Sequence, residues 1–447
     1  MRKFVSKSVL AYMILLPALI FLSSCSGKDY LDTVPEKSTA LMAVDVKQVF
    51  DNEISASFIK DLDGIDFSAK VYVFETTDGN IGLSAKVRDS DKFNEWLNKM
   101  AKKSLCQPTS LYNDYHFTVI RDSWVAGFSD DALVVLGPAL PSQQTELRRD
   151  IIKYLEQEEE ESIKGTQMFA RLDSINSAIS VVAQAAALPE KFIAPFCIGA
   201  PKDVDASEIM IAARLDLNED KCLVIHGQTF SFDKETDEAL NDSRKIFRPI
   251  TNKYISNLET TSVCGAFMNV EGSQFIKMLH SNKSFQAILA GINTAIDMDN
   301  IIKSIDGDVA ILLDDVSQGL NGIQMVAQLG NKNFLGDIDY WKSSCPAGSK
   351  ITDWEKDAYC YTANDFSYYF GVSTDMQFYS GSTAESAKAI LAKASRSLPA
   401  EVQNLVTGKR LVVIVNVDAL VSKDNTGFIA KIKSLTGGMK NIIYIMA

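Results

Sequence analysis

Cys25 is the side chain whose setting points most directly to a chemical reaction. It follows an apolar run from Val9 to Leu22, broken only by Pro17, and then the two small residues Ser23 and Ser24. Only a thiol can become a thioether, and small residues before it fit the cleft of a peptidase. The pattern predicts cleavage before Cys25 and attachment of diacylglycerol to its sulfur.

The residues around Cys25 support an exported, lipid-bearing chain. Arg2, Lys3 and Lys7 precede an apolar run that is shorter than the ~20 residues of a membrane-spanning helix, as in secretory signals. The junction before Cys25 resembles the bacterial lipobox, which implies a lipoprotein signal peptide over 1–24 and a polar tether over 25–37. Acyl chains such as palmitate contribute ~0.8 kcal/mol per buried methylene, so two or three of them anchor a protein stably. An ordinary signal peptide with an unrelated cysteine is the alternative.

The six remaining cysteines do not form a metal-binding pattern. Their spacing fits no zinc motif. Cys345 and Cys360 flank a polar loop and are the candidate disulfide. Two free thiols are the alternative, because a large domain does not need a covalent staple.

Catalytic signatures are missing from the sequence. The three histidines, His116, His226 and His280, lie far apart, and there is no H-E-x-x-H, no G-x-S-x-G and no phosphate-binding or dinucleotide glycine loop. An EF-hand counted from Asp61 fails at positions six and twelve. We therefore expect no cofactor, no metal and no enzymatic activity.

Aromatic residues are concentrated between Trp354 and Tyr379. Exposed aromatic rings with polar tips can stack on sugars, so Trp354, Tyr359, Tyr361 and Tyr368 are candidate ligand-binding residues. Core packing is the alternative, because alternation along a strand places such residues on a single face.

The charge of the chain excludes one class of partner. The full sequence has a formal net charge of −12, and residues 1–24 carry only positive charges, so the mature chain is more acidic still. A protein of this charge lacks the basic surface that nucleic-acid binding requires. We expect no nucleic-acid partner.

The chain repeats its own pattern. Gly127, Asp131 and Gly137 have counterparts 244 residues later, in the same order, with matching apolar runs between them. A tandem duplication is therefore predicted, with α+β units at 38–258 and 259–447, and chance recurrence is the alternative. Hairpin signatures such as Asp78-Gly79-Asn80 favour mainly antiparallel sheet covered by helices, one of them beginning near Ser90.

Two family resemblances concern different lengths of chain. The motif "DYLDTVPE" resembles the start of the D-type glycan-binding lipoproteins of starch-utilisation systems, but those proteins are largely helical. The stretches "VPEKSTALMAVDVKQVF" and "LDGIDFSAKVYVFETTDGNIGLSAKVRDSDKFNEWL" resemble the domain of unknown function 4836 family. That resemblance implies a bacteroidete-type envelope lipoprotein on the outer membrane and offers no catalytic residues.

The expected function is that of a non-enzymatic binding or scaffold lipoprotein of the cell envelope. It would be anchored to the membrane through Cys25, on the periplasmic or the surface face, and would bind an unknown envelope protein or glycan. A surface glycan-binding lipoprotein and an envelope hydrolase whose site forms only on folding are the alternatives.

Overall fold

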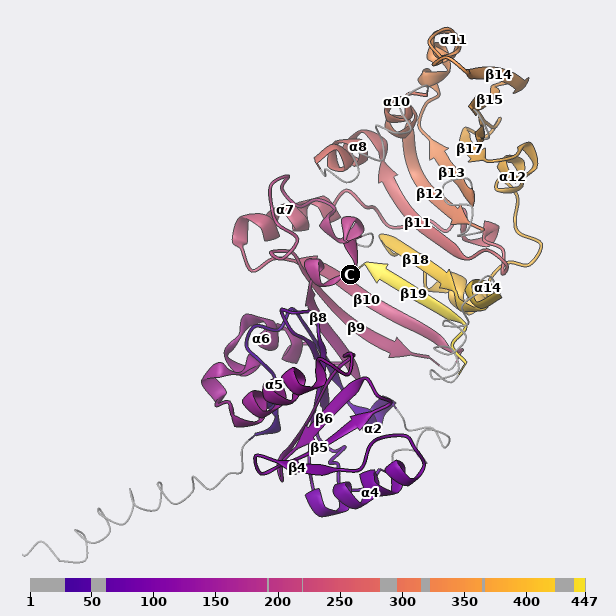
Figure 1. The fold of residues 1–447 in the computed structure, drawn as a ribbon. Coiled ribbons are helices and arrows are strands. Elements are labelled where there is room, and N and C mark those ends of the chain that lie inside the picture. Colours follow the sequence, from indigo (N-terminus) through magenta and orange to yellow (C-terminus); the bar gives the residue numbers. More distant parts are fainter. Residues whose placement is uncertain are drawn as a thin grey trace, which may run out of the picture. The chain divides into compact units, whose positions relative to one another are not determined.

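The computed structural model describes residues 29–49, 62–190, 193–218, 220–281, 296–314, 322–363, 366–422 and 438–446. It shows a mixed α+β protein in which almost all strand pairs are antiparallel. The chain forms two compact units, Met1–Ala170 (unit 1) and Arg171–Ala447 (unit 2), which are described separately (Figure 1).

Unit 1 is a seven-stranded antiparallel sheet with the strand order β4-β5-β6-β7-β3-β2-β1. Its strands are β1 (Ala40–Val44), β2 (Val71–Glu75), β3 (Ile81–Lys86), β4 (Ser110–Tyr112), β5 (Tyr115–Ile120), β6 (Trp124–Phe128) and β7 (Ala132–Gly137). Its helical segments are η1 (Tyr30–Thr33), α2 (Val46–Val49), α4 (Ser90–Lys102), α5 (Gln144–Glu156), η2 (Glu159–Glu161) and η3 (Ile163–Gly165), and α6 (Gln167–Asp173) follows at the boundary.

Helices cover both faces of the unit 1 sheet. Phe93 and Leu97 of α4 pack in one cluster with Ala126 and Phe128 of β6. Because successive strand residues point to opposite faces, Val125 and Gly127 face the other side. There α5 packs against β6 and β7, and η1 packs against β3 and β7.

In unit 2 the strand order is β14-β15-β16-β17-β13-β12-β11-β18-β19-β10-β9-β8, with a parallel pair at β19 and β10. The strands are β8 (Ile179–Gln184), β9 (Met210–Leu217), β10 (Cys222–Phe230), β11 (Cys264–Glu271), β12 (Ile305–Leu313), β13 (Ile323–Leu329), β14 (Ser349–Glu355), β15 (Ala358–Ala363), β16 (Phe366–Val372), β17 (Gln377–Gly381), β18 (Leu411–Asn416) and β19 (Asn441–Met446).

The helices of unit 2 pack on both faces of its sheet. They are α7 (Lys234–Arg244), α8 (Gly272–Ser281), α10 (Met298–Lys303), α11 (Ile338–Ser343), α12 (Ala384–Ala389), α13 (Ala400–Asn404) and α14 (Val417–Ser422), with short turns η4 (Ala185–Ala187), η6 (Ala194–Cys197), η7 (Ile255–Asn257) and η9 (Asn333–Asp337). One core lies under α8, α10 and α11 and includes Met268 and Val309. The core on the other face includes Phe267 and Ala310 and lies under α12 and α13.

The strand order of unit 1 recurs within unit 2. Adding ten to each strand label of unit 1 gives β14-β15-β16-β17-β13-β12-β11, which is the order observed in unit 2. The predicted boundary at 258/259 separates β1–β10 from β11–β19, whereas the compact units divide after Ala170. The difference arises because β8, β9 and β10 belong to the sheet of unit 2.

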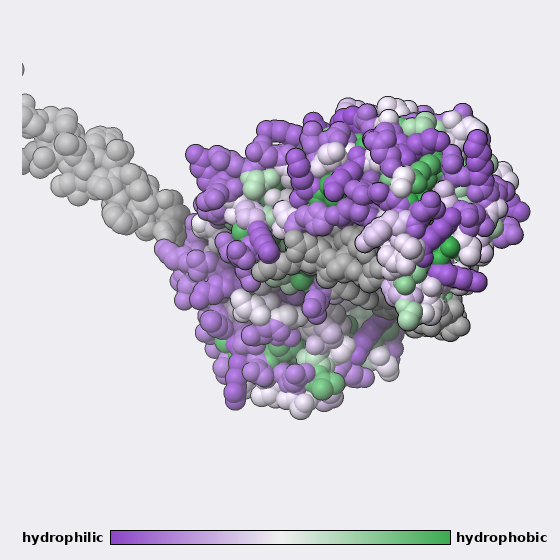
Figure 2. All heavy atoms as spheres, turned by 90° about the horizontal axis from the view of Figure 1, so that it is seen from above, coloured by the Kyte–Doolittle hydropathy of each residue, from purple (hydrophilic) through white to green (hydrophobic). Residues whose placement is uncertain are grey.

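The described residues show a hydrophilic exterior in the view of Figure 2, where apolar side chains are scattered among polar ones. Within the described ranges, no helix combines the length and apolar character that crossing a bilayer requires.

Candidate functional site

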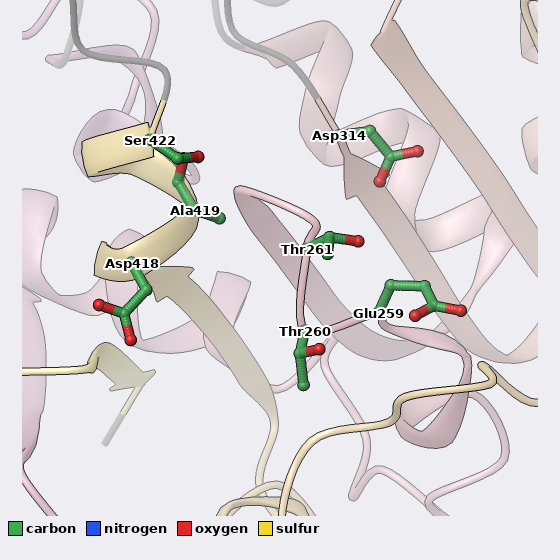
Figure 3. A pocket seen from close by; sticks show the side chains of 7 residues that line it. All are labelled: Glu259, Thr260, Thr261, Asp314, Asp418, Ala419 and Ser422. Carbon is green, nitrogen blue, oxygen red and sulfur yellow. The ribbon is translucent and has the colours of Figure 1, made fainter.

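An acidic pocket of about 500 Å³ lies at one end of the unit 2 strands (Figure 3). Asp418, Ala419 and Ser422 line it from α14, Asp314 follows β12, and residues 259–261 line it from the loop before β11. Figure 3 shows Asp418 on the α14 side and the carboxylates of Asp314 and Glu259 across from it. The pocket lining contains no histidine, cysteine or lysine.

Hydrogen bonds within the protein occupy most of these polar groups. Asp314 Oδ1 accepts from Ser262 Oγ at 2.5 Å, and Glu259 Oε1 accepts from the Ser395 amide at 2.9 Å. The Ser422 hydroxyl donates to the Ala419 carbonyl at 2.7 Å. No group of three metal-ligating side chains occurs among the described residues. The described residues of the pocket lining therefore present neither a nucleophile–base pair nor a cation site.

The predicted aromatic site is divided between the two faces of the unit 2 sheet. Trp354 packs with Tyr369 and Tyr379, at ring distances of 5.5 and 6.5 Å, and lies under the ammonium group of Lys388. These rings belong to the core under α12 and α13.

The three candidate tyrosines lie on the opposite face. Tyr359, Tyr361 and Tyr368 pack against the core under α11, and the ring of Phe370 is 5.7 Å from Tyr359 and 5.6 Å from Tyr368. Burial raises the pKa of Tyr368 to about 12. The four predicted residues therefore do not form a single stacking platform, and sugar binding by any one of them stays a prediction.

The predicted disulfide between Cys345 and Cys360 is not formed, and both residues are free thiols. Cys345 follows α11 and packs against the core that contains Tyr359 and Tyr361. Cys360 lies between these two tyrosines on β15, so its side chain points to the other face of the sheet. Spacing along the chain suggested the pair, but strand alternation separates the two sulfurs.

A wide set of half-exposed apolar side chains lies on the α8 face of the unit 2 sheet. We call these residues the apolar rows. They occupy two neighbouring positions on each of seven strands, and cross-strand pairing places them side by side. They are Leu215, Leu217, Leu223, Ile225, Cys264, Ala266, Ile311, Leu313, Ile323, Met325, Val413, Val415, Ile442 and Tyr444.

The contrast with the opposite face of the same strands is sharp. On β18, Val412 and Ile414 are 0% exposed. The alternate residues Val413 and Val415, which point to the α8 face, are half-buried. On β19, Ile443 is fully buried and its neighbour Ile442 is not. Leu217, at the edge, is 51% exposed. Helices α8 and α10 cover the other end of this face, where Met268 and Val309 are buried.

The sequence analysis did not identify the apolar rows. Strands such as "LVVIVN" and "NIIYIM" are apolar at every position except one terminal asparagine, which is typical of strands buried on both faces. The signal that was available is this lack of alternation along the two strands.

Cys264, a half-buried member of the apolar rows, offers a chemical test of how strongly its thiol is shielded from water. Burial raises the pKa of its thiol to about 11, so the reactive thiolate is scarce near neutral pH. Because a raised pKa means that the thiolate fraction keeps growing up to pH 11, we expect carboxamidomethylation of Cys264 to accelerate about tenfold per pH unit between pH 8 and pH 10. Mass spectrometry of the Cys264 peptide measures this rate, with the unfolded protein as control. A plateau below pH 9 in the folded protein would contradict the burial.

Cys25 lies outside the described residues. The predicted tether, by contrast, is largely described, and residues 29–36 are bound to unit 1 through η1 and backbone hydrogen bonds such as Ile163 N to Val34 O at 2.9 Å.

Comparison with known proteins identifies the family. Residues 55–421 match the family described as domain of unknown function (DUF4836). This chain belongs to the DUF4836 family. No curated protein matches the sequence.

Two crystal forms of the treponemal protein TP0453 are distantly similar to this DUF4836 protein. Form IV has 10% identity and a TM-score of 0.30 over 43% of this chain and 77% of its own. Form III has 8% identity and a TM-score of 0.22 over 82% of this chain and 98% of its own. At these TM-scores neither likeness says anything about function.

Proposed function

We propose that this DUF4836 protein is a lipid-anchored, non-enzymatic binding protein of the cell envelope that holds a partner protein on the apolar rows of unit 2. The observation that carries the proposal is the half-buried apolar face of the central strands β18 and β19, whose opposite face is buried. A contiguous apolar surface that the chain's own helices leave partly open is typical of interaction sites.

The dimensions and chemistry of the rows fit an amphipathic helix of the partner. Seven strands about 4.8 Å apart span roughly 29 Å, the length of a helix of about 19 residues. The two rows run side by side across the strands, and together they match the width of the apolar stripe of one helix. Helices α8 and α10 already pack in this way on the other end of the face, so a partner helix would extend the same layer.

The anchor part of the proposal rests on the sequence before Cys25. A basic start, a short apolar run and small residues before the cysteine are the features of a lipoprotein signal, and family membership is compatible with this origin. The proposed location is the outer membrane of a bacteroidete-type envelope, on its periplasmic or surface face.

The two alternative functions receive less support. A hydrolase needs a nucleophile beside a base, and the hydroxyl of Ser422 in the acidic pocket is directed to a backbone carbonyl instead. A glycan-binding platform needs coplanar exposed rings, and the candidate aromatics lie on two faces of the sheet.

We also propose that the protein arose by tandem duplication. The shared order of seven strands supports this history, as do the tight positions of corresponding glycines. A Cβ on Gly127 would lie 2.6 Å from Ile151 and Phe117, and one on Gly371 would lie 2.7 Å from Tyr379.

The decisive experiment compares variants expressed in the native cells. We expect wild-type protein in the membrane fraction and Cys25→Ser protein in the soluble fraction. After gentle detergent extraction, the wild type should retain a partner that Leu217→Glu and Leu223→Glu lose, because a carboxylate buried in an apolar interface costs about 2 kcal/mol or more, which is over tenfold in affinity.

The control is Leu140→Glu, which changes an apolar residue that is 67% exposed and lies outside the apolar rows. It should retain the partner. Identical partners for the wild type and the three glutamate variants would refute the binding surface, and membrane-bound Cys25→Ser protein would refute the anchor.

A further inference from the structure

The segment that follows the lipidation motif is part of the folded core of unit 1. Leu31 is 8% exposed and Val34 is 0% exposed. The Thr33 and Ser84 hydroxyls are 2.7 Å apart, and the Tyr30 hydroxyl donates to the Lys70 carbonyl at 2.8 Å. Burying two such aliphatic side chains contributes about 3–6 kcal/mol, so this segment does not behave as a loose tether.

Lys164 holds the start of this segment. Its Nζ lies 2.6 Å from Asp29 Oδ2 and 2.8 Å from Asp32 Oδ1, and its side chain is only 17% exposed. Burial lowers the pKa of Lys164, the two carboxylates raise it, and the net shift is upward. The Gln157 side chain also donates to the Asp32 carbonyl. The ion pairs are therefore part of a partly buried network that fixes Asp29.

An exposed acidic run lies beside this network. Glu158–Glu161 are all exposed, and Glu159 Oε2 is 3.7 Å from Lys164 Nζ. The backbone amide of Glu36 donates to the Glu161 carbonyl at 3.1 Å, so the acidic run and the docked segment are adjacent.

The chain length between Cys25 and Asp29 limits how far this surface can move from the membrane. Only three residues separate them. Four Cα–Cα steps span at most about 14 Å when fully extended. A lipid on Cys25 therefore keeps Asp29, Lys164 and their neighbours close to the lipid headgroups.

We propose that the surface of unit 1 formed by Asp29, Lys164 and Glu158–Glu161 faces the bilayer, with the docked residues 29–36 as a fixed spacer. This inference rests on the lipid attachment proposed above. Its four exposed carboxylates disfavour anionic headgroups, so the surface fits a membrane of zwitterionic lipids.

Energy transfer from an introduced tryptophan tests the orientation. Full-length lipidated protein is inserted in vesicles of phosphatidylcholine and phosphatidylethanolamine that carry a trace of dansyl-phosphatidylethanolamine. We expect Glu160→Trp to gain transfer over the wild type. The matched control is Glu95→Trp, which removes the same charge at an exposed site on α4, the helix that covers the opposite face of the unit 1 sheet.

Adding Lys164→Met to Glu160→Trp tests the spacer. Methionine keeps an apolar stem and removes the ammonium group that fixes Asp29, while Leu31 and Val34 stay buried, so the gain in transfer should become smaller without disappearing. Equal transfer from Glu160→Trp and Glu95→Trp, with the lipid on Cys25 confirmed by mass spectrometry, would overturn the orientation and leave the anchor intact. Protein without lipid would overturn the anchor and the orientation together.

Discussion

Replacing Asp308 with alanine is expected to lower the free energy of unfolding of unit 2 by about 4 kcal/mol. Asp308 lies on β12 and is 4% exposed. Its carboxylate accepts hydrogen bonds from the Thr251 amide at 3.0 Å, the Thr251 hydroxyl at 2.7 Å, the Lys253 amide at 2.9 Å and Asn269 Nδ2 at 2.7 Å. Alanine would leave the buried Asn269 amide without this acceptor and would remove the acceptor of three part-buried donors at Thr251 and Lys253.

Asp306→Ala is the matched control for this prediction. Asp306 is on the same strand, pairs with Arg248 at 2.8 Å and has a side chain that is 54% exposed. Exposed ion pairs contribute about 0–1 kcal/mol, so this variant should unfold almost like the wild type. Urea unfolding followed by hydrogen exchange of β11 and β12 measures both variants. An Asp308→Ala protein within 1 kcal/mol of the Asp306→Ala protein would show that water replaces the carboxylate.

Local signals in the sequence predicted individual elements well. The Asp78-Gly79-Asn80 signature predicted the hairpin of β2 and β3, and Gly79 has the positive φ of 77° that its turn requires. The predicted helix near Ser90 is α4. Its N-cap is Asp89, whose side chain accepts from the Lys92 amide at 3.0 Å, as is common for aspartate at this position.

Features that depend on tertiary packing were not visible in the sequence. Nothing in "IDGDVAILL" distinguishes the buried Asp308 from the exposed Asp306, because the donors to Asp308 come from residues more than 30 positions away. The same limit applies to the docked segment. "DYLDTVPE" has the composition of a polar linker, and its partner Lys164 lies more than 130 residues later.

The candidate site shows the same division between local and non-local information. The aromatic run from Trp354 is real, but the sequence did not reveal that strand alternation directs Trp354 to one face and Tyr359 and Tyr361 to the other. The recurring pattern of glycines has a physical reason, because Gly127 and Gly371 both occupy positions with no room for a side chain. Steric constraints of this kind restrict the residue type and are visible in the sequence, whereas apolar strands alone do not show which of their faces is open.

Replacing Gly272 with alanine is expected to destabilise unit 2 by about 2–3 kcal/mol, because the new methyl group would collide with the backbone of a neighbouring segment. Gly272 is the first residue of α8, and a Cβ there would lie 1.8 Å from the Ile302 carbonyl oxygen and 3.0 Å from the Ile305 carbonyl oxygen. A carbonyl oxygen in a packed backbone cannot move aside as a flexible side chain can. Helix α8 must therefore shift away from α10, which opens the core around Ile276 and Ile301.

Gly336→Ala is the control, since a Cβ at Gly336 meets nothing within 4 Å. Alanine at position 336 reduces the conformational freedom of the unfolded chain. The variant should therefore be as stable as the wild type or more stable by about 0.5 kcal/mol. Urea unfolding of the two variants, followed by hydrogen exchange in α8 and α10, separates the outcomes. If the Gly272→Ala protein keeps both wild-type stability and wild-type protection in these helices, the close packing of α8 on the 302–305 backbone is wrong. In that case the part of the sheet under α8 would be packed as loosely as the apolar rows. The difference in burial that supports the proposed binding surface would then disappear.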